Sequence, residues 1–264
     1  MNVIEAITRR RSHRHEYQDR AIEENDLSML IEAARWAPSP FNVQPWSIIF
    51  IQESEGKDIL ADMTEQVILA QFKDTQFLED NSQWMRINEA EWQEYGDGVL
   101  LTDHVSIPKF IEKSSDGVTG KILKGMLNNR KVLSIIGHLG GGKEPAKEIA
   151  TKVREAPLLV IVTMDTECRP PGEGATRWML LSIGMLVQNM LLTATSLGIG
   201  VQFVSAPLEH ETDRDKIRHL FHIPHHHEVI TLLRMGYEDT ESGSSVRLKP
   251  TEIVHYEKFQ IKKE

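Results

Sequence analysis

The sequence predicts an α+β protein, because stretches with helical periodicity alternate with compact runs of apolar, β-branched residues. Apolar side chains recur at helical spacing in residues 26–36. The runs at residues 46–51 and 157–164 have the length and composition of buried strands. Residues 178–208 contain no charged side chain, which indicates a long helix at the centre of the fold and a strand after it.

The composition is that of a globular protein large enough to bury a sizeable core. The chain has 264 residues, of which 40% are hydrophobic and 26% charged. The formal net charge of −9 argues against wholesale binding of nucleic acid or anionic membranes. The single cysteine, Cys168, cannot form an internal disulfide, and the N-terminus lacks the features of a signal peptide. We therefore expect a cytoplasmic protein that forms one large domain or two small ones.

Arginines gather near the N-terminus, directly after a short amphipathic helix predicted from Val3, Ile4 and Ile7. Residues 9–14 read Arg-Arg-Arg-Ser-His-Arg, and four arginines so close together repel one another unless they are solvated or face an anion. The planar guanidinium group matches phosphate with two hydrogen bonds, and Ser12 adds a small donor. A solvated basic turn is the alternative interpretation of this cluster.

Residues 37–46, Ala-Pro-Ser-Pro-Phe-Asn-Val-Gln-Pro-Trp, form a rigid connector between the first long helix and the first strand. The three prolines exclude regular helix. Ser39, Asn42 and Gln44 carry side chains that both donate and accept hydrogen bonds, as the edge of a flat heteroaromatic ring requires. An ordinary loop of turn-forming residues is the alternative.

Together, the Arg10-Arg11-Ser12-His13-Arg14 element and residues 37–46 resemble the FMN-dependent nitroreductase family. That family opens with R-R-S-x-R, continues with a helix, and then carries A-P-S-x-x-N-x-Q-P-W before a strand. The resemblance covers residues 1–53 well and 155–255 moderately. It implies a central, mainly antiparallel sheet covered by helices, in a nitroreductase-like interlocked homodimer.

The resemblance also implies roles for the matching residues. Arg10 and Ser12 would lie toward the phosphate and ribityl chain of FMN. Arg14 would lie toward the pyrimidine edge, where its charge would stabilise the reduced flavin. The other positions that the resemblance assigns to the cofactor site are Arg11, Pro38, Ser39, Pro40, Asn42, Gln44 and Gly200. Near the C-terminus, Arg247 and Lys249 are the two candidates for a further contact with the phosphate, and the sequence does not decide between them.

The resemblance implies a single domain at 1–264 with a helical insertion or lid at about 54–155. Residues 54–155 carry helical patterns of their own, at 59–72 and 118–133. Within this insertion, Gly137–Lys143 fits the phosphate-binding motif G-x-x-x-x-G-K. Glu144 follows, however, where that motif needs a serine or threonine to hold magnesium. We therefore favour a glycine hinge over a nucleotide triphosphatase.

The charge-free stretch predicts a helix over 177–197 that is buried on all sides and ends at Gly198. A membrane helix is the alternative, but several polar residues lie within the stretch and no basic cluster flanks it. One sheet can cover only part of such a helix. We therefore expect a second copy of the chain to cover the rest, with Leu186 at the centre of the contact.

Four histidines, at positions 222, 225, 226 and 227, raise the question of a metal site. Adjacent histidines on a turn cannot all converge on one ion, and no carboxylate lies at helical spacing from them. We therefore expect a solvated loop and no metal.

The resemblance implies an FMN-dependent oxidoreductase with ping-pong kinetics. NAD(P)H would give hydride to flavin N5 and leave, and a nitroaromatic, quinone or similar acceptor would then take it. Because this chemistry takes place on the flavin, no catalytic side chain is expected. The alternatives are another reaction on the same fold (dehalogenation, ring desaturation or flavin cleavage) and a non-catalytic flavin-binding protein. The expected partners are a second copy of the chain and the small acceptor, with neither nucleic acid nor membrane.

Overall fold

The computed structural model describes the whole chain except residues 87–88, 101–141, 241–242 and 260–264. The chain forms two compact units, one made of Met1–Leu69 and Ala146–Ser242 and the other of Ala70–Pro145 and Gly243–Glu264. The helix predicted at 118–133 and most of the glycine motif at 137–143 lie outside the described residues. The single domain with a lid stays a prediction.

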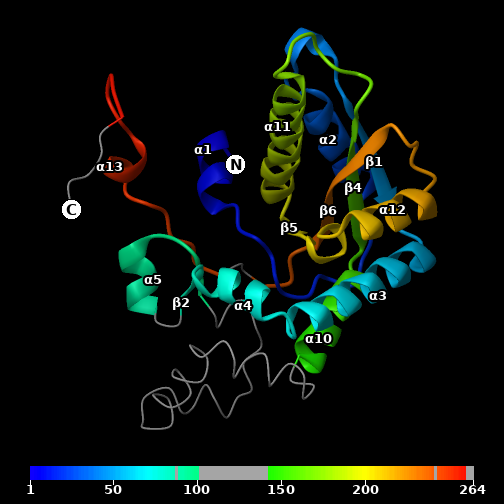
Figure 1. The fold of residues 1–264 in the computed structure, drawn as a ribbon, viewed down its shortest axis with the longest axis horizontal. Coiled ribbons are helices and arrows are strands. Elements are labelled where there is room, and N and C mark those ends of the chain that lie inside the picture. The colour runs from blue at the N-terminus through cyan, green and yellow to red at the C-terminus, as the bar shows by residue number, and fades with distance from the viewer. Residues whose placement is uncertain (87–88, 101–141, 241–242, 260–264) are drawn as a thin grey trace. The chain divides into compact units, whose positions relative to one another are not determined.

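A four-stranded sheet forms the centre of the first unit (Figure 1). Its strands are β1 (Trp46–Ile51), β4 (Leu158–Asp165), β6 (His227–Tyr237) and β5 (Ile199–Phe203), in the order β1-β4-β6-β5. Each neighbouring pair is antiparallel. The predicted mainly antiparallel sheet is therefore confirmed.

The strand β4 shows why the sheet is covered on both faces. Leu158, Val160 and Val162 belong to one core cluster, and Leu159 and Ile161 belong to the other. Successive side chains of a strand point to opposite faces, so a continuous apolar run needs a cover on each side.

Helices provide both covers, as Figure 1 shows. The helices α2 (Glu24–Arg35) and α11 (Ala175–Ser196) supply the first core cluster. The helices α3 (Ser54–Gln71), α10 (Lys143–Arg154) and α12 (Glu211–Leu220) supply the second cluster. The prediction of a sheet covered by helices is confirmed.

The helix α11 is buried along one side only, so the prediction that it is buried on all sides is wrong for one protomer. Leu186, predicted to lie at the centre of a contact between two copies, is 0% exposed and packs into the core of its own chain. Trp178 and Leu181 are about half exposed, at 53% and 49%. Among the described residues this helix alone is long and apolar enough to cross a membrane, a test that core helices of soluble proteins also pass.

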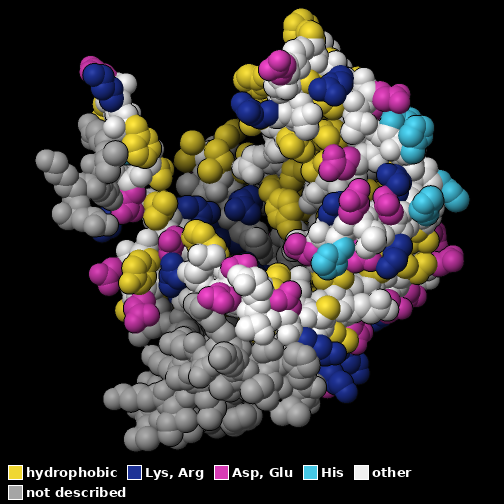
Figure 2. Space-filling model, in the orientation of Figure 1, with side chains coloured by type: hydrophobic (Ala, Val, Ile, Leu, Met, Phe, Trp, Pro, Cys, Tyr) yellow, Lys and Arg dark blue, Asp and Glu magenta, His cyan; other side chains and the backbone are white. Residues whose placement is uncertain are grey.

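The first helix, α1 (Val3–Arg9), begins with a capping box between Asn2 and Glu5 and buries only Ala6. It packs beside α11. Both helices carry exposed apolar side chains, which we group under the name α1–α11 apolar face, and Figure 2 shows hydrophobic side chains over both helices. This face comprises Val3, Ile4, Ile7, Trp178, Leu180 and Leu181.

The second unit is made of short elements. These are α4 (Thr75–Ser82), β2 (Met85–Arg86), α5 (Glu89–Tyr95), β3 (Val99–Leu100) and α13 (Pro250–Ile253). The strands β2 and β3 are parallel. Nε1 of Trp92, a buried residue, donates to the carbonyl oxygen of Gly98 at 3.1 Å, which holds α5 against β3.

Candidate functional site

Residues 10–14, which we call the arginine segment, follow α1 and lie beside β5, the edge strand of the sheet. Arg10 ends the helix with extended backbone, at φ −53° and ψ 127°. Ser12 forms a parallel bridge with Val201 of β5, and the backbone N–H of His13 donates to Val201 O at 3.0 Å. The sheet edge therefore fixes the backbone of the segment, and Arg10, Ser12 and Arg14 are all partly buried along it.

Arg11 has a local structural task. Its Nη1 donates to the carbonyl oxygens of Thr8 at 2.7 Å and Arg10 at 2.8 Å. An arginine at a helix C-terminus commonly satisfies the last carbonyl groups in this way. The guanidinium group of Arg11, a predicted cofactor residue, therefore already forms hydrogen bonds at the C-terminal end of α1.

Arg234 of β6 holds the backbone of this segment in place, and it was not among the site residues predicted from the sequence. It is 1% exposed, and its Nη2 donates to the carbonyl oxygens of His13 at 3.1 Å and His15 at 3.0 Å. These two carbonyls flank Arg14. Nε of Arg234 donates to Gln202 Oε1 at 2.6 Å, and burial lowers the pKa of Arg234. A lone charge inside an apolar strand was the sequence signal that could have revealed this residue.

The fully buried His13 fills the space beneath the arginine segment. Its ring stacks on Tyr17 with 5.0 Å between centroids, and its Nε2 lies 2.9 Å from Glu16 O. Burial lowers the pKa of His13. A Cβ atom on Gly200 would lie 2.6 Å from Cγ of His13, so this position must be glycine for the segment to approach β5. The structure thus gives Gly200 a role in positioning the arginine segment.

The proline-rich connector, residues 37–46, has an unusual backbone. Phe41, Asn42 and Gln44 have φ values of 52°, 53° and 47°, which residues other than glycine rarely adopt. Ser39 Oγ accepts a hydrogen bond from Gln44 N at 3.0 Å, and Gln44 Nε2 donates to Asn42 O at 3.3 Å. Backbone strain of this kind is concentrated at functional sites.

The connector is anchored to the end of β4. Asp165 N donates to Pro45 O at 3.0 Å, and Cys168 Sγ donates to Val43 O at 3.1 Å. These contacts hold the connector beside the loop that precedes α11. Pro38, Asn42 and Gln44 remain exposed, and Ser39 and Pro40 are half-buried.

Within the first unit, the predicted site residues therefore form two groups at opposite ends of α11. The connector lies at the N-terminal approach to α11, whereas the arginine segment and Gly200 lie at β5, which follows its C-terminus (Figure 1). A helix of 22 residues is about 33 Å long. One protomer does not bring the two groups together.

Arg247 and Lys249 belong to the second unit. Nη1 of Arg247 donates to Ser245 Oγ and to Val246 O, and Lys249 N donates to Glu252 Oε2 at 3.1 Å at the start of α13. Both residues are exposed. The choice between them stays open.

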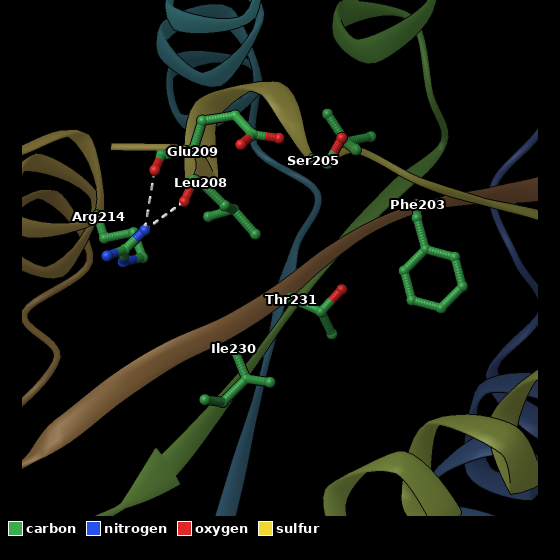
Figure 3. A pocket seen from close by; sticks show the side chains of 8 residues that line it. Phe203, Ser205, Leu208, Glu209, Arg214, Ile230 and Thr231 are labelled. Carbon is green, nitrogen blue, oxygen red and sulfur yellow. Dashed lines mark hydrogen bonds between the residues drawn. The ribbon is translucent and has the colours of Figure 1, made fainter. Parts of the chain in front are cut away.

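A cavity of about 310 Å³ opens beside β5 and β6, and Figure 3 shows the side chains that line it. Arg214 is its cation, but Nη1 of Arg214 donates to the carbonyl oxygens of Leu208 at 2.5 Å and Glu209 at 3.3 Å. None of the predicted site residues lines this cavity. We therefore do not assign it a ligand.

Comparison with known proteins gives consistent results for family and fold. The model of the nitroreductase family matches residues 7–237. A Methanothermobacter thermautotrophicus protein provisionally named NADH dehydrogenase/NAD(P)H nitroreductase is 24% identical over 261 residues, which are 98% of this chain and 88% of that protein.

Solved structures share the fold. Nitroreductase A from Vibrio parahaemolyticus has a TM-score of 0.60 at 15% identity, with 100% of this chain and 79% of the other covered. The NADPH:FMN oxidoreductase from Vibrio harveyi, complexed with NAD⁺, has a TM-score of 0.59 at 16% identity, with coverage of 100% and 80%. A nitroreductase family protein from Clostridium difficile has a TM-score of 0.54 at 22% identity, with coverage of 98% and 100%.

Proposed function

We propose, because the chain belongs to the nitroreductase family over residues 7–237, that it is an FMN-dependent NAD(P)H oxidoreductase. Its acceptor would be a small oxidised molecule such as a nitroaromatic compound or a quinone. The observation that carries the proposal is the clamped arginine segment, in which Arg234 and β5 fix the backbone on both sides of Arg14. The fixed backbone defines where the side chains of Arg10 and Arg14 begin, and a guanidinium group suits a phosphate.

The residues of the two groups fit the two ends of a flavin mononucleotide. Arg10 and Ser12 would hold the phosphate and ribityl end, and Arg14 would bring positive charge to the pyrimidine edge. Asn42 and Gln44 offer amide groups on a backbone already held in the left-handed region. When bound, the flavin would accept and donate hydride at N5. The side chains of this chain would bind, orient and tune it, without acting as general acid or base.

Two copies of the chain would then complete each site. The two groups of predicted residues lie at opposite ends of α11, so a single flavin can contact both only if the second group comes from a partner. A twofold axis that packs α11 against its copy in an antiparallel sense would bring the ends together. The half-exposed α1–α11 apolar face supports this arrangement, because a monomer rarely leaves such a surface in water.

The identity of the cofactor tests the proposal directly. Protein purified in the presence of added flavin is denatured by boiling, and the supernatant is separated by chromatography. We expect FMN, together with turnover of NADH or NADPH in the presence of a nitroarene or a quinone. Recovery of FAD, or of no flavin after reconstitution, would contradict the proposal. A yellow protein without turnover would point to a flavin-binding protein instead.

Alanine substitutions should separate the two ends of the cofactor. Arg10→Ala should remove a charged hydrogen bond of about 1.5–3 kcal/mol and weaken FMN binding roughly 10- to 150-fold. Arg14→Ala should chiefly lower the reduction potential of the bound flavin. Arg9→Ala is the matched control, because Arg9 is exposed in the last turn of α1. Titration of the apoprotein with FMN measures the affinity, and potentiometry measures the reduction potential. If both variants behaved like Arg9→Ala, Arg10 and Arg14 would belong to a solvated turn without contact to the flavin.

A further inference from the structure

The antiparallel pairing of β4 with β6 brings a carboxylate beside the histidine cluster. Asp165, the last residue of β4, pairs with His227, the first residue of β6. Oδ2 of Asp165 lies 3.8 Å from Nε2 of His227. One ligand atom from each of Asp165, His226 and His227 lies within 4.8 Å of the others. Figure 2 shows histidine side chains gathered at this edge of the first unit.

Hydrogen bonds orient the side chains of Asp165 and His227 and the backbone of His226. Nδ1 of His227 lies 2.9 Å from Thr163 Oγ1, so the tautomer that donates to Thr163 leaves Nε2 with a lone pair facing Asp165. Oδ1 of Asp165 accepts hydrogen bonds from the backbone N–H groups of residues 167 and 168, at 2.9 and 3.2 Å, which leaves Oδ2 available. The carbonyl oxygen of His226 accepts from the backbone N and the Oγ1 of Thr166, at 2.8 and 2.7 Å. A fixed second nitrogen is the usual arrangement for a histidine that binds metal.

We propose that Asp165, His226 and His227 bind one divalent transition-metal ion, with water completing the coordination. Two imidazoles and one carboxylate suit ions such as Zn²⁺, whereas Mg²⁺ and Ca²⁺ prefer all-oxygen sites. Ligand atoms on a tetrahedral zinc ion lie about 3.3 Å apart, given bonds near 2.0–2.1 Å. The Asp165–His227 pair, at 3.8 Å, therefore needs to close by about 0.5 Å.

Four histidines on one turn cannot all bind one ion. The proposed site uses only two of them and takes its third ligand from β4, 61 residues earlier in the chain than His226. Glu167, His225 and His226 form a second, more exposed group that shares His226. We assign the ion to the first group, because hydrogen bonds already orient the side chains of two of its ligands, His227 and Asp165, and its members are all half-buried.

The proposed ion would also stiffen the connector at residues 37–46. Asp165 N donates to Pro45 O, and Cys168, whose N–H donates to Asp165, contacts Val43 O through its Sγ. A metal bond to Asp165 would therefore hold the turn to which this connector is attached. The metal site itself does not depend on flavin binding.

Calorimetric titration of the untagged full-length chain with ZnCl₂, after chelator treatment and dialysis, tests the proposal. We expect one Zn²⁺ per chain, and neither Mg²⁺ nor Ca²⁺ should compete. Asp165→Asn and His227→Gln should each weaken Zn²⁺ binding at least tenfold, because each removes a ligand while keeping the size of the side chain. His219→Ala and His222→Ala are matched controls on exposed histidines outside the site, and they should bind like the unmodified chain.

Two further variants distinguish the proposed site from the neighbouring group of Glu167, His225 and His226. His225→Ala and Glu167→Gln should keep Zn²⁺ binding, and loss of binding in these two with retention in Asp165→Asn would overturn the assignment. Equal binding by all variants, or no binding by the unmodified chain, would also overturn it. Circular dichroism and thermal melting of each variant without metal separate ligand loss from unfolding. If His227→Gln proves unfolded, Asp165→Asn and His226→Gln decide the question.

Discussion

Arg234→Met should lower the free energy of unfolding by roughly 3–5 kcal/mol and weaken FMN binding in the protein that remains folded. Methionine nearly fills the space of the arginine stem but cannot donate hydrogen bonds. The carbonyl oxygens of His13 and His15 and the amide oxygen of Gln202 would then lose their donor in a buried site. Each such loss costs about 1–3 kcal/mol. Urea unfolding curves measure the stability change.

Two further variants test the assigned role of Arg234. Arg234→Lys keeps the charge but not the planar fork, so it should recover only part of the stability. Arg218→Met is the matched control, because Arg218 forms a surface pair with Asp215 on α12 that is worth about 1 kcal/mol or less. Titration with FMN of those variants that fold reports on the arginine segment. If Arg234→Met were as stable as the control and bound FMN equally well, the hydrogen bonds of Arg234 to the arginine segment would contribute neither to stability nor to FMN binding.

Leu181→Glu should convert the protein to a monomer and abolish FMN retention. Leu181 is 49% exposed on the α1–α11 apolar face, so glutamate is tolerated in the free protomer. In the proposed dimer the charge would be buried without a partner, and twofold symmetry would duplicate it. Such a change costs several kcal/mol per interface. Light scattering coupled to size exclusion measures the mass, and absorbance measures the flavin.

Two controls for Leu181→Glu separate the effect of the position from the effect of the added charge. Leu181→Met keeps the apolar contact and should remain dimeric and yellow. Thr212→Glu adds the same charge at an exposed position in the first turn of α12, on the opposite side of the sheet. A dimeric, flavin-bound Leu181→Glu protein would contradict the proposed interface. So would an unmodified chain that binds FMN as a monomer.

The sequence by itself determined most of the elements and the family. β1 begins and ends at the predicted residues 46 and 51, and α2, β4 and α11 each lie within two residues of the predicted bounds. These elements have strong local signals, because an apolar run or a helical period requires a cover irrespective of what supplies it. The R-R-S-x-R element and the connector at 37–46 are local as well. They could therefore be recognised without knowledge of the fold.

Tertiary structure alone decided which side of α11 is covered and which distant residues meet. In a helix that is apolar nearly all round, periodicity does not show which side is covered. Leu186 faces its own sheet and Leu181 faces outward, although both residues are leucines on the same helix. Arg234 contacts carbonyl groups more than 200 residues away in the chain, and Asp165 joins the histidines only through the register of β4 with β6. Such pairings depend on how strands are ordered in the sheet, and a single sequence carries no local signal for that order.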